Sequence, residues 1–307
     1  MDHASSQPSY RSASVRRWAT RLWRDAILQR GQPIATPQAR PTPSDWADDR
    51  ITAAWLGHAT VLINFFGLTI LTDPALFPGI GIRVPGITLG PRRLIAPALN
   101  FKELPKINLV LVSHAHFDHH DLQTLRLFDS STQVVTAART RDLFPGKRWH
   151  DLSELRWGES KTLTSRNRSA TITAIPVKHW GARLHYDDYR GYNGYLIERE
   201  GRRIIFSGDT AFSESFAAVR DRRGIDLAIM GIGCYNPWIR THCSPEQAVS
   251  MANDAAAHFI MPVHHQTFRL SFEPFREPIE RFESALQKTP ERIALREIGE
   301  TFVLPIL

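Results

Sequence analysis

A cluster of metal-binding side chains follows directly after an apolar run in the first half of the chain. Residues 107–112 have the composition of a buried strand, and residues 113–121 read Ser-His-Ala-His-Phe-Asp-His-His-Asp. In an extended segment, His114 and His116 point the same way and can share one ion. Asp118 and His119 come next and are placed to reach a second ion. A strand that ends in this way predicts a dinuclear metal site.

The ordinary alternative is a solvated histidine-rich loop, because a lone His-x-His proves little. Two features favour metal binding here: the cluster lies at the end of a strand, and further candidate ligands occur downstream.

Those downstream candidates also follow apolar runs. His179 follows residues 175–177, Asp209 follows residues 204–206, and His264 ends the run 259–263. Each has a plainer reading: His179 as a structural histidine, and Asp209 as a helix cap. His264 and His265 are neighbours that point in opposite directions on a strand, so only one of them can face a metal. The residues alone leave that choice open.

The chain resembles the metallo-β-lactamase superfamily, and within it the N-acylphosphatidylethanolamine-hydrolysing phospholipase D-like branch. The string His-Ala-His-Phe-Asp-His at 114–119 matches the superfamily's His-x-His-x-Asp-His signature. Six shorter strings occur in the family's order and extend the resemblance over about residues 50 to 307: Trp-Leu-Gly-His-Ala-Thr (55–60), Leu-Thr-Asp-Pro (71–74), Gly-Pro-Arg-Arg (90–93), Lys-His-Trp (178–180), Ser-Gly-Asp-Thr (207–210) and His-His-Gln-Thr-Phe (264–268).

The resemblance implies a complete ligand set. The family's string places its ligand three residues before the Thr-Phe pair, which selects His264 over His265. Imidazole and carboxylate ligands suggest two divalent ions, zinc first, with manganese or iron as alternatives. The implied set is His114, His116 and His179 on one metal, Asp118, His119 and His264 on the other, and Asp209 bridging them.

Other residues in the matching strings are candidates for supporting roles. His58 and Asp73 are expected to orient metal ligands from outside, although His58 can equally be a buried turn histidine. His242 follows a Gly/Pro-rich loop and is a candidate substrate contact or proton donor; otherwise it is a loop histidine. Three aromatic residues close to ligands in the sequence are expected to line the substrate pocket, unless they only pack: Trp180, Tyr186 and Trp238.

The pattern of the chain predicts an α/β fold. Apolar runs predict strands at 51–55, 60–65, 68–71, 107–112, 225–230, 258–263, 292–296 and 301–304, and a hairpin of 193–198 with 202–206. Helices are expected at 122–128, from Ser244 onward, where a capping box stands, and at 274–286. Two strand-rich halves with helices outside predict an αββα sandwich of two facing mixed sheets, and the resemblance implies the same fold. Residues 77–99, rich in Gly and Pro, are expected to be a loop that walls the site.

Residues 1–48 differ in composition from residues 49–307, which we expect to form the hydrolase domain. The extension has a polar start, a basic amphipathic helix within residues 14–30, and a Pro-rich linker over residues 31–44. Such a helix packs on its own domain or on a partner chain, or it lies on an anionic membrane. The oligomeric state stays open, a dimer included.

Composition narrows the class of partner. A net charge of +7 indicates either anionic partners, such as a phosphate-bearing small molecule, a phospholipid or an acidic membrane surface, or simply a basic, soluble surface. No basic stripe interleaved with aromatics is present, so nucleic acid is not expected. Two cysteines and no apolar run approaching about 20 residues lead us to expect a cytoplasmic protein, with peripheral contact at the inner membrane as an option.

The predicted centre implies hydrolysis. Two ions that share a water molecule lower its pKa toward neutrality, and Asp118 is placed to handle the proton. The resemblance implies phosphodiester cleavage of the phospholipase D type, which releases an N-acylethanolamine. Lactone or carboxyl-ester hydrolysis is the alternative chemistry, and a non-catalytic binding module is the alternative class.

Overall fold

The computed structural model describes residue 20 and residues 32–85, 87–146, 149, 151–165, 168–184 and 186–305. The amphipathic helix predicted within residues 14–30 therefore lies outside the described residues, apart from residue 20. The division at residues 48 and 49 stays a prediction. Residues 32–48 nevertheless contact the domain, since the Ala35 N–H donates to Leu94 O at 2.9 Å.

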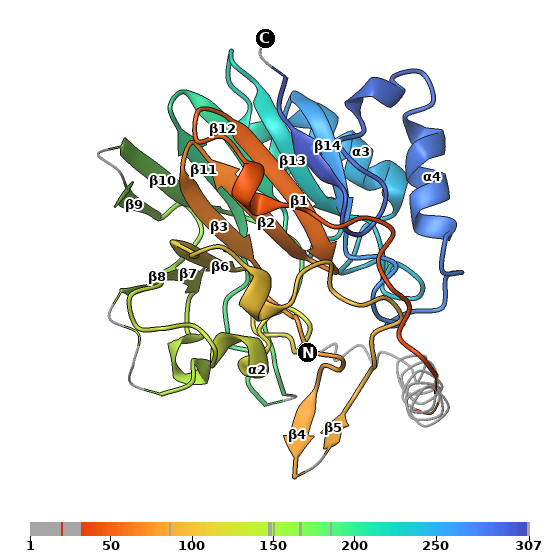
Figure 1. Ribbon diagram of the computed structural model, residues 1–307. Coiled ribbons are helices and arrows are strands. Elements are labelled where there is room, and N and C mark those ends of the chain that lie inside the picture. The colour runs from red at the N-terminus through yellow and green to blue at the C-terminus, as the bar shows by residue number, and fades with distance from the viewer. Residues whose placement is uncertain are drawn as a thin grey trace, which may run out of the picture.

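Two mixed β-sheets face each other, as predicted (Figure 1). In the first sheet β15, β1, β2 and β3 run antiparallel, and β3, β6, β7 and β8 run parallel. Its strands, in the order of the sheet, are β15 (Thr301–Val303), β1 (Ile51–Gly57), β2 (Thr60–Phe65), β3 (Leu68–Thr72), β6 (Leu109–Val112), β7 (Gln133–Ala137) and β8 (Leu152–Leu155).

In the second sheet β14, β13 and β12 are parallel, whereas β12, β11, β10 and β9 alternate in direction. The hairpin of β11 and β12 turns at residues 200 and 201, where we predicted it. The strands are β14 (Ala257–Val263), β13 (Ile225–Gly231), β12 (Arg202–Phe206), β11 (Gly194–Arg199), β10 (Arg168–Ile175) and β9 (Ser160–Ser165).

The main hydrophobic core lies between the sheets and contains side chains of both, including Ile63 and Leu111 of the first and Ile197 and Phe206 of the second. A second cluster lies on the other face of the second sheet. There α3 (Pro245–Asp254) and α4 (Glu277–Ala285) pack beside β13 and β14 (Figure 1). The Ser244 side chain accepts from the Gln247 N–H in the predicted capping box, which fixes the start of α3.

The remaining helices are short. Asp121 caps α2 (Leu122–Leu125), which begins at the predicted residue 122 but ends before the expected residue 128. The 3-10 helices are η2 (Pro43–Asp45), η3 (Phe101–Glu103), η4 (Arg141–Leu143), η5 (Glu214–Val219) and η6 (Pro290–Arg292). No helix among the described residues is long and apolar enough to cross a bilayer.

Two sequence predictions were wrong. Residues 292–296 form no strand: η6 ends at Arg292, and only Ile293 bridges to Ile260. The segment 77–99 is not free of regular structure. It contains the hairpin of β4 (Ile82–Val84) and β5 (Ile87–Leu89), which projects from the body of the molecule (Figure 1).

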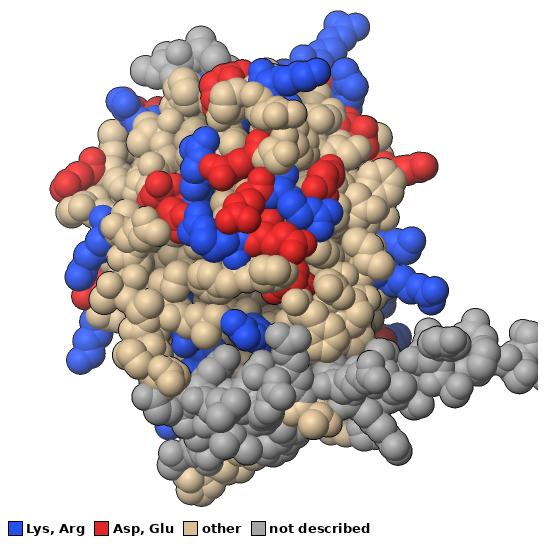
Figure 2. All heavy atoms as spheres, turned by 90° about the vertical axis from the view of Figure 1, so that its right-hand side faces the viewer, with Lys and Arg blue, Asp and Glu red and all other residues tan. Residues whose placement is uncertain are grey.

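The positive net charge is not gathered on the face that carries α3 and α4. Figure 2 shows basic and acidic side chains interspersed there. Arg281 pairs with Glu246 at 2.8 Å and with Glu277 at 3.2 Å, and Arg296 pairs with Glu283 at 2.6 Å. Exposed pairs of this kind contribute about 0–1 kcal/mol each, so they add little to the stability of the fold.

Candidate metal centre

The predicted ligands follow strands whose carboxyl ends meet at one edge of the sandwich. β6 precedes His114, β10 precedes His179, β12 precedes Asp209 and β14 precedes His264. β12 and β14 both run parallel to β13, and β10 runs in the same direction because two antiparallel pairings separate it from β12. The topology therefore brings ligands that are distant in the sequence to one place.

The first cluster has the spacing of a metal site. The ligand atoms of His114, His116, His179 and Asp209 all lie within 4.8 Å of one another. His116 Nδ1 is 2.9 Å from His114 Nε2 and 3.3 Å from His179 Nε2. Zinc bonds of about 2.0–2.1 Å place tetrahedral nitrogen ligands about 3.3 Å apart. The donor set thus fits a divalent ion.

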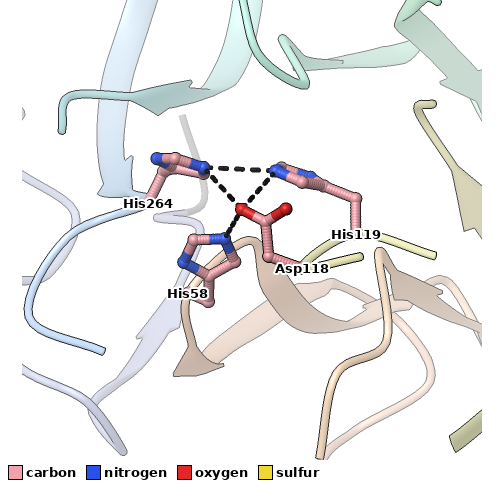
Figure 3. A group of neighbouring side chains, drawn as sticks. All are labelled: His58, Asp118, His119 and His264. Atoms are coloured by element: carbon pink, nitrogen blue, oxygen red, sulfur yellow. Dashed lines mark hydrogen bonds and ion pairs between the residues drawn. The ribbon is translucent and has the colours of Figure 1, made fainter. Parts of the chain in front are cut away.

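A second cluster, His58, Asp118, His119 and His264, lies beside the first (Figure 3). His264 Nε2 is 3.1 Å from His119 Nε2, and Asp118 Oδ2 is 3.5 Å from both nitrogens. His58 Nε2 is 2.8 Å from the same Asp118 oxygen. His58 therefore either orients Asp118 from outside the metal site or provides a metal ligand itself.

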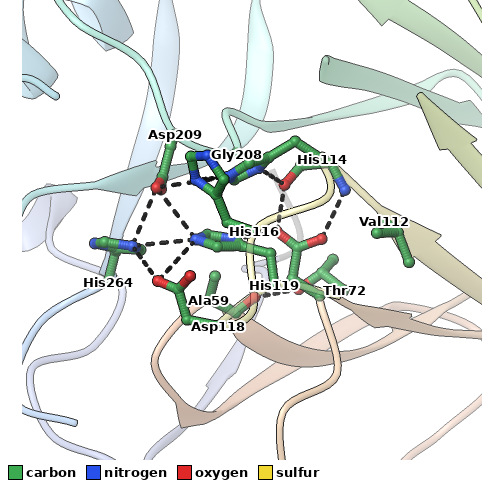
Figure 4. Close-up of polar contacts among 12 residues, drawn as sticks. Ala59, Thr72, Val112, His114, His116, Asp118, His119, Gly208, Asp209 and His264 are labelled. Atoms are coloured by element: carbon green, nitrogen blue, oxygen red, sulfur yellow. Dashed lines mark hydrogen bonds and ion pairs between the residues drawn. The ribbon is translucent and has the colours of Figure 1, made fainter. Parts of the chain in front are cut away.

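Asp209 joins the two clusters (Figure 4). Its Oδ2 is 3.1 Å from His119 Nε2 and 3.2 Å from His264 Nε2 in the second cluster. The same oxygen is 3.8 Å from His179 Nε2 and 3.9 Å from His114 Nε2 in the first. A carboxylate in this position would be shared by ions bound in the two clusters. Asp209 caps no helix, because η5 is capped by Ser213.

Three imidazoles are oriented by hydrogen bonds at the ring nitrogen that faces away from the cluster. His119 Nδ1 lies 2.7 Å from Asp73 Oδ2, and His114 Nδ1 lies 2.8 Å from Ser113 Oγ, whose own hydrogen goes to Asp73. His179 Nδ1 lies 2.8 Å from Thr241 O. A carboxylate or carbonyl only accepts, so Nδ1 of His119 and of His179 carries the proton and the Nε2 lone pair is free for a metal.

Burial and mutual contacts set the protonation state of the cluster. Burial lowers the pKa of His58 to about 3 and that of His116 to about 4. Burial opposes ionisation of Asp118 and Asp209, but the nearby His119 holds both pKa values well below the usual range. Burial disfavours the charged forms of His119 and His264, but Asp209 and Asp118 outweigh it: they raise the pKa of His119 well above its usual range and that of His264 to about 9, so both rings would give up a proton when a metal ion binds.

An apolar pocket of about 510 Å³ opens on the two clusters. His116, Asp118 and Asp209 lie at its base, with His242 Nε2 3.2 Å from Asp209 Oδ2. One wall comes from the segment around β4 and β5, and the facing wall from the segment after His179. The apolar lining is Ile80, Ile82, Leu89, Pro91, Phe117, Trp180, Leu184, Trp238 and Leu270.

Two arginines hold the walls of this pocket. Arg93 is buried, donates to Phe77 O at 3.2 Å, and lies 5.1 Å from the Phe268 ring. Arg183 Nη1 donates to Ala115 O at 2.8 Å and to His120 O at 2.9 Å, and its guanidinium stacks 4.0 Å above the ring of Phe117.

The pocket and clusters include most of the predicted site residues. Trp180 and Trp238 line the pocket, but Tyr186 is not among the lining residues described and is 67% exposed. His265 lies away from the clusters, with its ring 4.5 Å from that of Trp55. Sequence reasoning missed Ser113, Arg183 and the carbonyl of Thr241. Of these, only Ser113 had a visible signal, its place beside His114.

Comparisons with known proteins agree with this geometry. The family model described as the beta-lactamase superfamily domain matches residues 69–265. The N-acyl-phosphatidylethanolamine-hydrolyzing phospholipase D 1 of Caenorhabditis elegans is 28% identical over 263 residues, which cover 78% of this chain and 71% of the relative. The mitochondrial N-acyl-phosphatidylethanolamine-hydrolyzing phospholipase D of Saccharomyces cerevisiae is 32% identical over 260 residues, 80% of this chain and 54% of the relative.

Among solved structures, the metallo hydrolase Igni18 of Ignicoccus hospitalis has a TM-score of 0.61 and 19% identity, and the match covers 84% of this chain and 99% of that one. At this sequence identity, the structural similarity supports the fold alone. The family model and the curated relatives go further: the chain belongs to the β-lactamase superfamily, as a metallo-hydrolase similar to the N-acylphosphatidylethanolamine-hydrolysing phospholipases D.

Proposed function

We propose that this protein is a phosphodiesterase that hydrolyses N-acylated phospholipids in the manner of a phospholipase D, with two divalent ions bound by the clusters described above. The observation that supports this most strongly is the apolar pocket of about 510 Å³ that opens directly on the clusters. Acyl chains require an apolar surface next to the scissile phosphodiester, and this pocket offers one.

The proposed ligand roles follow from the geometry. His114, His116 and His179 hold one ion, Asp118, His119 and His264 hold the other, and Asp209 Oδ2 lies between them. Zinc is the first expectation for this donor set. Ions in these sites would supply Lewis-acid activation of water and of the phosphoryl oxygen.

The chain's own groups handle the proton and the leaving group. Water attacks phosphorus, the bond from phosphorus to the ethanolamine oxygen breaks, and the products are phosphatidic acid and N-acylethanolamine. Asp118 lines the pocket, and its carboxylate is placed to accept the proton of the attacking water. His242 also lines the pocket beside Asp209, where its ring can donate a proton to the departing oxygen.

The test is hydrolysis of N-acylphosphatidylethanolamine in mixed micelles by the metal-loaded protein in ¹⁸O-labelled water. We expect N-acylethanolamine as product, with the label in phosphatidic acid. Label in a released fatty acid would indicate carboxyl-ester hydrolysis instead, and no product from a fully loaded protein would indicate a binding module. His116→Ala should abolish turnover, whereas His258→Ala, at an exposed histidine near the start of β14, should not change it.

A further inference from the structure

His264 differs from three other imidazoles of the centre in the partner of the ring nitrogen that faces away from the metal site. His114, His119 and His179 each contact a protein oxygen through Nδ1. His264 Nδ1 is buried and has no hydrogen-bonding partner among the described residues. Figure 3 shows this nitrogen pointing away from His58, Asp118 and His119.

A second buried group without a partner lies next to it. Gln266 is 4% exposed, and neither its side-chain oxygen nor its side-chain nitrogen has a partner in the described part of the chain. Leaving a buried polar atom unpaired is unfavourable, because the atom loses its hydrogen bonds to water. Three such atoms on His264 and Gln266, together with the two ring nitrogens of the neighbouring His265, are therefore expected to have partners that are not protein.

Both residues line a small cleft of about 40 Å³ on the far side of His264. A buried water molecule needs about 10–15 Å³ and two to four polar partners, so the cleft has room for one to three waters. It is a separate cavity from the substrate pocket, and it lies next to that pocket because Cys234 and Leu270 line both. Only something as small as water fits the volume and the mixture of donors and acceptors.

We propose that this cleft is a hydration site in which an ordered water, anchored by the Gln266 amide, accepts the hydrogen of His264 Nδ1. The water then does for His264 what Asp73 does for His119: it fixes the ring orientation and the tautomer so that Nε2 faces the second ion. The backbone supports this arrangement, because the His264 N–H donates to His58 O at 2.9 Å and holds the residue at a φ of 64°. This inference rests on the proposed role of His264 as a ligand.

The first test needs no variant. A high-resolution crystal structure of the metal-loaded protein should show a water within hydrogen-bonding distance of both His264 Nδ1 and the Gln266 side chain. A dry cleft, or a protein atom that contacts Nδ1 in its place, would overturn the proposal.

The second test is a metal-competition titration of Gln266→Met, which keeps the side-chain length and removes both polar atoms. We expect one of the two binding steps to weaken about 10- to 100-fold, the range found when outer-shell partners are removed. Gln266→Glu should keep most of the affinity, because its carboxyl can still hold the water. If both metal-binding affinities of Gln266→Met equal those of the wild type, the proposed role of the water is contradicted. A wild-type protein that binds no metal would instead refute the dinuclear centre, and a crystal of that metal-free protein would then show separately whether the water is present.

Discussion

Asp73 and His119 form a fully buried hydrogen bond of 2.7 Å between Oδ2 and Nδ1, behind the second metal cluster. The same carboxylate accepts the backbone N–H of Ser113 at 2.7 Å and the Ser113 hydroxyl at 2.6 Å, and that hydroxyl contacts His114. One side chain directly after β3 thus orients an imidazole in each cluster.

Replacing Asp73 by Asn should weaken metal binding at both sites. The amide keeps the shape but places an NH₂ group against a hydrogen-bond donor. Loss of an outer partner typically costs 10- to 100-fold in metal affinity. Competition titration with a chromophoric chelator measures this, with Asp45→Asn at an exposed position as the control. Affinity equal to that of the wild type would show that Asp73 does not orient the ligands.

Arg183 is expected to hold the loop that carries His114, His116, Asp118 and His119. Arg183→Met removes two hydrogen bonds to carbonyls of this loop, at Ala115 and His120. The free energy of unfolding should fall by about 2 kcal/mol or more, since bonds to a charged donor contribute about 1.5–3 kcal/mol each. Urea unfolding and metal titration measure the effect, and Arg183→Lys should be intermediate. An unfolding free energy within about 0.5 kcal/mol of wild type would contradict this role.

Much of the fold was predictable because the strongest signals are local. β1, β2 and β3 are continuous apolar runs, and the start of α3 carries its own cap at Ser244. The edge strand β9 was missed because Leu163 is the single buried residue among its described side chains. The hairpin of β4 and β5 was missed since its six residues pair mainly with each other and contribute little to a core.

The site was predictable because each of the four segments that carry ligands follows an apolar strand. The structure brings all seven predicted ligands together, and it places His264 rather than His265 in the cluster. The outer contacts could not be predicted in the same way. Thr241 contributes a backbone carbonyl, which any residue could supply, and Arg183 acts on a loop more than 60 positions earlier in the chain.

Arg190 is expected to order the segment between His179 and β11. It is 6% exposed and contacts Asp187 at 2.7 Å and Asp142 at 2.6 Å. Arg190→Met leaves the buried Asp187 without its cationic partner, with the Leu184 N–H still donating to its other oxygen at 2.7 Å, and should destabilise the fold by about 3 kcal/mol. Asp142→Asn should cost only about 0–1 kcal/mol, because Asp142 is exposed.

The stability change caused by Asp142→Asn should depend on pH. The hydrogen bond from Arg190 lowers the pKa of Asp142 relative to the unfolded chain. Such a carboxylate stabilises the fold above its unfolded pKa of about 3.9, and the contribution is lost as pH falls through the lowered folded value. Urea midpoints of wild type and Asp142→Asn should differ by a constant amount from neutral pH to about pH 5 and converge below about pH 4. A difference that grows in acid would contradict the pairing.

Side chains on the pocket wall should set the preference for acyl chains. Ile82→Ser removes apolar surface from the β4 wall, and we expect kcat/KM for a long-chain substrate to fall about 5- to 10-fold, as burial of part of an aliphatic side chain predicts. A soluble short-chain phosphodiester should be hydrolysed as by the wild type. Leu127→Ser is the matched control, because Leu127 is 44% exposed and is not among the pocket residues described. Equal loss on both substrates would show that Ile82 acts on the fold and not on the acyl chain.

The most direct test of the dinuclear centre is the metal content of the purified chain after loading with zinc and removal of excess, measured by elemental analysis. The account predicts two ions per chain, and fewer than two in Asp209→Asn, because this carboxylate lies within 4 Å of ligands in both clusters. A wild-type chain that retains no metal, or a single ion that is unaffected by the Asp209 substitution, would contradict it.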